Sequence, residues 1–166
     1  MKPEPHADLY RRNLEEGQEF QDFVALVLYR HHGIVLVNFQ SKAAQATMGE
    51  NLAGFEIKND RKFNETRRVF IEIAEKGDPS WTDFVPSGIY RKDSWIYVVG
   101  DRKILFLFPI NQLVRMHQSG TYEEKEGWLP GATGPTSRGF LLPEAVARDA
   151  AAKIVVVGEN GLTRRR

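Results

Sequence analysis

The sequence Gly-Phe-Glu-Ile-Lys at positions 54–58 constrains the fold more than any other stretch of the chain. Apolar and charged side chains alternate along it, which predicts a short β-strand. Successive side chains of a strand point to opposite faces, so Phe55 and Ile57 are expected on an apolar face and Glu56 and Lys58 on a polar face. Residues i and i+2 lie about 6.5 Å apart on one face. A carboxylate and an ammonium are therefore expected side by side on a rigid element.

This polar face suits metal-assisted hydrolysis of a phosphodiester. Mg²⁺ binds through one or two carboxylates and keeps several waters, which makes Glu56 a candidate ligand. Lys58 is a compact cation with three donors, suited to contact the attacking water or the scissile phosphate. Glu50 supplies a second carboxylate across the flexible Ala53-Gly54 pair. The candidate catalytic residues are Glu50, Glu56 and Lys58, and the expected cofactor is Mg²⁺ or Mn²⁺, because oxygen ligands favour these ions over zinc.

An acid, a spacer and a Glu-Ile-Lys triplet resemble the motif of the PD-(D/E)xK nuclease superfamily, which has the restriction-endonuclease-like fold. In this resemblance Glu50 is the first acid, Glu56 the second and Lys58 the lysine. The chain departs from the usual pattern because no Pro-Asp precedes the triplet, the first acid is Glu, and the spacer is short. The resemblance implies an α/β fold with an αβββαβ core and a mixed central sheet, here with extra strands and a C-terminal helix.

The resemblance also implies an acid on the first helix. In nucleases of this superfamily, among them archaeal Holliday-junction resolvases and small phage-type nucleases, that helix often carries an acid that joins the metal site. The apolar spacing within Leu9 to His32 predicts such a helix, ended by Gly33. Its candidate metal ligands are Glu19 and Asp22. The alternative is that both belong to a solvated acidic face.

Two further segments are expected to be strands near the triplet. Ile34 to Phe39 is a β-branched apolar run that predicts a buried strand, and positions 41–48 fit either a loop or one helical turn. Val69 to Lys76 alternates and predicts an antiparallel hairpin with the Glu56 strand. That pairing would place Glu72 beside Glu56, as an extra metal ligand or as a partner of the lysine. A plain cross-strand charge pair is the alternative.

The second half of the chain predicts a central hairpin and two helices. The runs Ser94 to Gly100 and Ile104 to Ile110 are apolar and flank a polar turn, which is typical of well-covered paired strands. A helix is expected over Gln112 to Gln118. Pro143 is expected to open an alanine-rich helix that runs to Lys153, before a last short strand.

Basic side chains are concentrated near the triplet. Four of them lie in the eight-residue segment 61–68 that follows it, and two loops add three more. Such contacts to phosphates position a nucleic acid without reading its bases. The alternative is a solvated turn with balancing acids. The basic tail Arg164 to Arg166 would add electrostatic affinity. The candidate nucleic-acid-binding residues are Arg61, Lys62, Arg67, Arg68, Arg91, Lys92 and Arg138.

Composition indicates one globular domain. The chain has 166 residues, of which 42% are hydrophobic and 27% charged. We expect a nuclease-like core over about 17–120 and a C-terminal loop and helix extension over 121–166. The absence of cysteine excludes disulfides, thiolate zinc sites and cysteine nucleophiles. No run approaches the ~18 apolar residues of a membrane helix, so we expect a cytoplasmic protein with no membrane partner. The net charge of +1 gives no argument for nucleic acid.

Together these patterns predict a metal-dependent endonuclease that acts on DNA, with RNA left open. Cleavage of both strands of a duplex would suggest a homodimer. One alternative is a catalytically inactive module of the same fold that binds nucleic acid or takes part in an assembly. Another is a structural protein in which Glu56, Lys58, Glu72 and Lys76 form a cross-strand charge ladder. The inactive module would place Glu50 too far from Glu56 to share an ion, or facing away from it.

Overall fold

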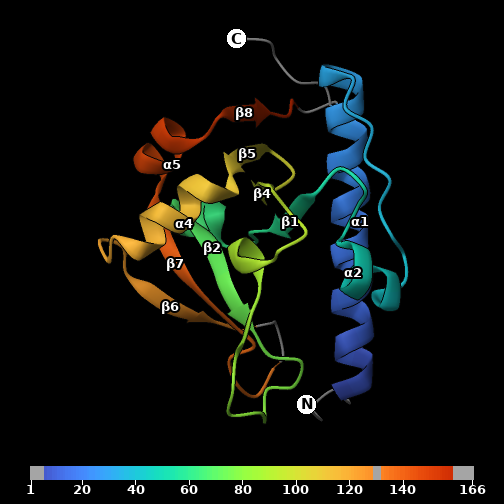
Figure 1. Ribbon diagram of the computed structural model, residues 1–166, viewed down its shortest axis with the longest axis vertical. Coiled ribbons are helices and arrows are strands. Elements are labelled where there is room, and N and C mark those ends of the chain that lie inside the picture. Colours follow the sequence, from blue (N-terminus) through green and yellow to red (C-terminus); the bar gives the residue numbers. More distant parts are fainter. Residues whose placement is uncertain (1–5, 129–131, 159–166) are drawn as a thin grey trace.

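The computed structural model describes residues 6–128 and 132–158 and contains two sheets beside a long helix (Figure 1). The tail Arg164 to Arg166 lies outside these residues. The helices are α1 (His6–His32), α2 (Lys42–Met48), α3 (Phe63–Thr66), α4 (Ile110–Gln118) and α5 (Glu144–Ala150), with a 3₁₀ turn η1 (Gly88–Tyr90). The strands are β1 (Phe55–Asn59), β2 (Arg68–Glu75), β3 (Val85–Pro86), β4 (Ile96–Gly100), β5 (Ile104–Pro109), β6 (Glu124–Gly127), β7 (Ser137–Pro143) and β8 (Lys153–Val156).

The first sheet is mixed and has the strand order β1-β4-β5-β8. Its edge strand β1 contains the Glu-Ile-Lys triplet and runs parallel to β4, whereas the other two pairings are antiparallel. The predicted apolar hairpin is confirmed as β4 and β5. These two strands lie at the centre of the sheet, and nearly all of their side chains are buried. The α/β class with a mixed sheet is therefore confirmed.

The second sheet is antiparallel and has the order β3-β2-β7-β6. The predicted hairpin between Val69 to Lys76 and the Glu56 strand is wrong, because β2 pairs with β3 and β7 in this other sheet. The connection from β1 contains α3, whose Phe63 is buried against Phe106 with the ring centroids 5.4 Å apart. The chain thus passes from the first sheet to the second through α3, where this ring is buried. The αβββαβ core is not confirmed, because β1 and β2 lie in different sheets.

Two apolar clusters show what lies on each face of β1. One fills the space between the sheets and contains Tyr97. The other lies between the first sheet and α1 and contains Ile57 and Val98. In the register of the sheet Glu56 is opposite Tyr97, and Ile57 is opposite Val98. Alternation along the strand therefore directs Ile57 toward α1 and directs Glu56 and Lys58 toward the second sheet, as the sequence predicts.

The segments before β1 differ from expectation in one place. The predicted strand at Ile34 to Phe39 is wrong, because only Asn38 makes an isolated bridge, to Asn51. Val35 and Val37 are exposed, so this apolar run has no neighbouring strand that would bury it. Positions 41–48 contain the short helix α2. The predicted first helix is confirmed as α1.

Two helices end or begin away from their predicted positions. Helix α4 begins at Ile110, directly after β5, earlier than expected. Helix α5 ends at Ala150, because Lys153 already belongs to β8. Within the described ranges, no helix has both the length and the apolar character needed to cross a bilayer.

The contact between η1 and β2 gives a stability test. Gly88 has φ +56°, and a Cβ there would overlap the backbone carbonyl of Glu72. We expect Gly88→Ala to lower the free energy of unfolding by about 1–2 kcal/mol from the left-handed backbone, with a further ~1–3 kcal/mol from the overlap. Gly120→Ala is the matched control, because Gly120 has φ +67° and open space around it. Urea denaturation measures both variants, and equal losses would contradict the packing described here.

Candidate functional site

Glu56 lies at the centre of the site and is completely buried. Lys58 Nζ lies 2.9 Å from its Oε1, and Arg91 Nε lies 3.4 Å from its Oε2. Neither oxygen receives a well-aligned hydrogen bond from the residues that the structure describes. Burial raises the pKa of Glu56 to about 8; the charge of Lys58 opposes the shift, and the nearby carboxylates of Glu50 and Glu72 add to it. Burial therefore favours the protonated form of this carboxyl more than water would.

Glu50 reaches the same strand from the loop that follows α2. Its Oε2 accepts a hydrogen bond of 2.9 Å from the backbone N–H of Ile57, the residue next to Glu56. The Glu50 side chain is buried, and burial raises its pKa while the charge of Lys58 lowers it. The structure thus brings together the two acids and the lysine that the sequence proposes as catalytic. Glu50 does not face away from the strand, as the inactive-module alternative would allow.

Lys58 connects the two sheets. Its ammonium lies 2.9 Å from Glu56 Oε1 and 3.0 Å from Glu72 Oε1, and Glu72 is on β2. Burial opposes the charge of Lys58, but the carboxylates of Glu56 and Glu72, together with those of Glu50 and Glu75, raise its pKa well above the usual value. Its side chain is 26% exposed, more than that of Glu72 at 12% or Glu56 at 1%.

Glu72 occupies the predicted place beside Lys58, although it arrives from the other sheet and not from a hairpin. Ser87 Oγ donates a hydrogen bond of 3.0 Å to Glu72 Oε1. The backbone N–H of Glu72 donates to the hydroxyl of Tyr97 at 3.1 Å. Sequence analysis missed Ser87 and Tyr97, because their roles depend on how β2 packs against η1 and β4. The Ser87-Gly88 pair signalled only a turn.

Arg91 is part of the site, not of a free basic surface. It forms two hydrogen bonds with the carboxylate of Asp93, at 2.9 and 2.7 Å, and a third with the backbone carbonyl of Gln45 at 2.9 Å. The hydrogen bonds from Arg91 hold the pKa of Asp93 below its usual range. These contacts fix the guanidinium next to Glu56 and tie α2 to the site.

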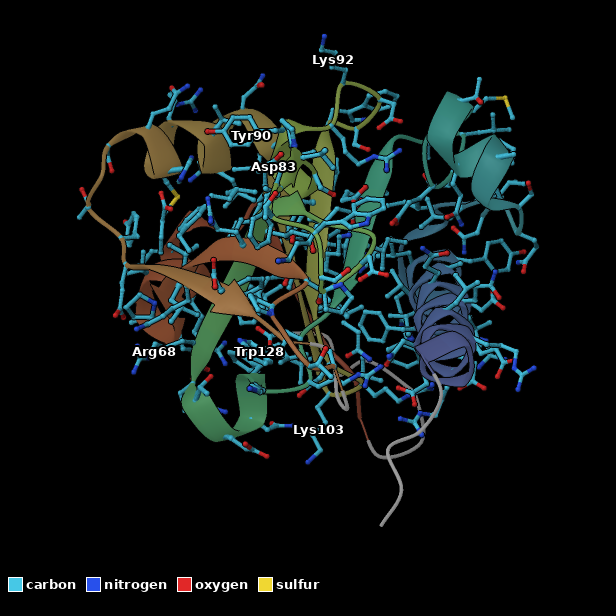
Figure 2. All side chains as sticks on the ribbon, turned by 90° about the horizontal axis from the view of Figure 1, so that it is seen from below. Arg68, Asp83, Tyr90, Lys92, Lys103 and Trp128 are labelled. Carbon is cyan, nitrogen blue, oxygen red and sulfur yellow. The ribbon has the colours of Figure 1, made fainter. Side chains whose placement is uncertain are left out.

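The other predicted nucleic-acid-binding residues are spread over the molecule. Figure 2 shows Lys92 extending outward from its loop, well apart from Arg68. Within the described ranges, Lys62 and Lys92 have no ion-pair partner. The remaining four are each paired with a carboxylate: Arg61 with Glu16, Arg67 with Glu144, Arg68 with Glu123 and Arg138 with Glu126. Their role in binding nucleic acid stays a prediction.

The structure does not bring Glu19 and Asp22 to the site. Both lie on α1, which covers the opposite face of the first sheet, so the sheet separates them from Glu56. Glu19 instead lies 3.7 Å from Arg102, and both acids line an open pocket of about 370 Å³. The helix face was predicted from sequence, but the face of the sheet that the helix covers is set by Ile57 and its apolar neighbours.

The donor set at Glu50 and Glu56 fits a hard divalent cation. The two oxygens of Glu56 lack well-aligned hydrogen bonds, and Glu50 has a second oxygen besides the one bonded to Ile57. Carboxylate oxygens are the ligands that Mg²⁺ and Mn²⁺ prefer, and Mg²⁺ keeps several waters. Among the described residues, no group of three or more His, Asp and Glu side chains is arranged to hold a metal ion. These donors therefore suit an ion that takes two protein carboxylates, those of Glu50 and Glu56.

No family model, curated protein or solved structure matches this chain. Its function is therefore argued from the geometry of the site.

The raised pKa of Glu56 predicts a pH-dependent stability. Between its ordinary pKa of 4.5 and about 8, the folded protein keeps a proton that the unfolded chain releases. The folded state then binds more protons, so the free energy of unfolding should fall as pH rises through this window. Glu56→Gln removes the titrating group and should flatten the slope. Urea denaturation from pH 5.5 to 8.5 measures it.

Glu19→Gln is the control for this prediction, because Glu19 is an exposed acid on the other side of the first sheet. It should leave the slope of the wild type unchanged. Glu50 is also buried with a raised pKa, so part of the slope should remain in Glu56→Gln. A slope in this variant as steep as that of the wild type would show that burial of Glu56 is not its source.

Proposed function

We propose that this chain is a Mg²⁺- or Mn²⁺-dependent phosphodiesterase that cleaves DNA. The proposal is carried by one observation, the convergence of Glu50, Glu56 and Lys58 in a buried cluster at the edge of a mixed sheet. The resemblance of these residues, in type and order, to the PD-(D/E)xK nuclease motif supports it. Strongly perturbed carboxyl groups beside a cation are also typical of catalytic sites.

Glu50 and Glu56 are the proposed cation ligands. A bound Mg²⁺ or Mn²⁺ would lower the pKa of a coordinated water and offset charge on the phosphate. Glu56 would bind the cation in its deprotonated form, so binding should strengthen as pH rises toward about 8. Arg91 holds its place beside Glu56 through Asp93. It adds fixed positive charge near the position of the phosphate.

Lys58 is proposed to orient the attacking water or to contact the scissile phosphate. Its ammonium has two carboxylate partners, on Glu56 and Glu72, and its side chain is the most exposed of the three. With a cation held at Glu56, Glu72 would still hold Lys58, and Ser87 would hold Glu72. Glu72 and Ser87 are therefore proposed to position the lysine, and Glu72 as a direct ligand is the alternative.

A second candidate function is a module that binds nucleic acid without cutting it. The observation that favours it is the neutralisation of Glu56 by Lys58 and Arg91, two cations that compete with a metal ion. The third possibility, a four-residue charge ladder, does not form. Lys76 donates to the backbone carbonyl of Trp81 at 2.7 Å and lies over the ring of Phe84, away from the cluster.

A cleavage assay separates the nuclease from the module. Labelled single-stranded, duplex and branched DNA are incubated with the wild type, Glu56→Gln and Lys58→Met, in Mg²⁺, Mn²⁺ or EDTA. We expect metal-dependent cleavage by the wild type and none by Glu56→Gln. Lys58→Met should cut at least about 10²–10³-fold more slowly, the usual loss when one stabilising donor is removed.

Lys103→Met is the matched control, because Lys103 also carries a lysine charge but extends into solvent at the turn after β4 (Figure 2). Its cleavage rate should equal that of the wild type, and circular dichroism should show every variant folded. A wild type that binds DNA and never cuts it would support the module. Undiminished cleavage by Lys58→Met would remove the lysine from the proposed chemistry.

A further inference from the structure

Trp95 is an exposed aromatic side chain next to the site, with no part in the roles assigned above. Its side chain is 59% exposed, although its backbone is held on both sides. Its N–H donates to the Gly54 carbonyl, and its carbonyl accepts from the N–H of Ile110, both at 2.9 Å. Trp95 therefore sits in a fixed position in the first sheet, directly before β4, and not on a loose loop.

The indole lies face down on Gly54. A Cβ on Gly54 would be 2.5 Å from three consecutive atoms of the six-membered ring, Cε2, Cζ2 and Cη2, which places that Cβ over the ring face. The ring thus fills the space that a side chain at position 54 would take. This position directly precedes β1 and lies two residues before Glu56 in the sequence.

The register across the sheet gives the same placement. Phe55 is opposite Ile96, and the hydrogen bond from Trp95 to Gly54 continues this pairing by one residue, so the indole lies at the start of β1. One side of the ring is packed on the Gly54 backbone, and its large exposed fraction leaves the other side open to solvent. The structure thus presents a flat aromatic surface at the start of β1, the strand that carries Glu56.

Positive charge lies close to Trp95 in the sequence. Arg91 contacts Glu56, and the exposed Lys92 has no ion-pair partner among the described residues (Figure 2). An aromatic ring beside cations is the combination with which proteins bind single strands, since the cations follow the phosphates and the ring stacks on a base. A phosphate near Lys58 would bring its base toward Trp95.

We propose that Trp95 is a stacking platform for an unpaired base, and that the site therefore selects single-stranded nucleic acid over continuous duplex. This inference rests on the proposed phosphodiesterase function. Bases inside a duplex are stacked on both faces, so an indole finds a free base face only where the strand is unpaired. Every base has such a face, so the preference should be for strand state and not for sequence.

Binding in EDTA tests the platform without any cleavage. The fluorescence anisotropy of labelled oligodeoxythymidine and of a labelled duplex is followed with the wild type, Trp95→Ala, Trp95→Phe and Trp95→Leu. We expect Trp95→Ala and Trp95→Leu to weaken single-strand binding about ten-fold or more, the usual effect of losing one base stack. Trp95→Phe keeps an aromatic face and should retain most of the affinity. Duplex binding should change little in all three.

Trp128→Ala is the matched control. Trp128 is similarly exposed, at 55%, but follows β6 in the second sheet, and Figure 2 shows it well apart from Lys92. This variant should bind both probes as the wild type does. Trp95→Leu keeps an apolar side chain over Gly54, so it tests stacking even if Trp95→Ala fails to fold.

The possible outcomes separate this inference from the proposed function. Unchanged single-strand binding in Trp95→Leu, or equal losses for single strand and duplex, would overturn the platform while metal-dependent cleavage could still be observed. A wild type that neither binds nor cuts any of the probes would overturn both. Selective loss of single-strand binding, with rescue by Trp95→Phe, is the result that supports the platform.

Discussion

One lysine joins the two sheets by contacting an acid on each. The ammonium of Lys58 contacts Glu56 on β1 and Glu72 on β2, at the border of an apolar cluster that fills the space between the sheets. Without this cation, Glu50, Glu56 and Glu72 would place three acidic groups near one another with little solvent to screen them. The lysine therefore stabilises the packing of the two layers and also holds the acids within reach of one another.

Burial of these acids lowers the stability of the fold, which is understandable if the acids serve a function. Glu56 is buried with its pKa raised to about 8, and its oxygens lack aligned hydrogen bonds. A buried acid in this state would be replaced by an apolar residue in a purely structural sheet at little cost to stability. Its presence beside Glu50 and Lys58 is understandable if the acids bind a cation while Glu72 keeps the lysine in place for a substrate. The contact between Lys58 and Glu56 thus stabilises the fold, whereas the proposed cation would take the place of the lysine at Glu56.

Sequence patterns predicted which side chains share a face of β1 better than they predicted which elements lie next to it. Alternation alone assigned Glu56 and Lys58 to one face, and both are there. It could not show that Glu72 comes from a second sheet, because periodicity within a strand defines its faces but not its pairing. Glu19 and Asp22 lie on the predicted helix but not at the site as predicted, because apolar packing at Ile57 decides which face of the first sheet α1 covers. The run Ile34 to Phe39 is apolar yet lacks a partner strand.

The central claim is that these acids form a cation site and not only an internal ion-pair cluster. Calorimetric titration with Mn²⁺ tests it most directly, since it needs no substrate and no knowledge of strand preference. The account predicts saturable binding by the wild type, loss of binding in Glu56→Gln, and unchanged binding in Glu19→Gln, whose side chain lies beyond the first sheet. A wild type that takes up no Mn²⁺, or a Glu56→Gln variant that binds it equally well, would contradict the account.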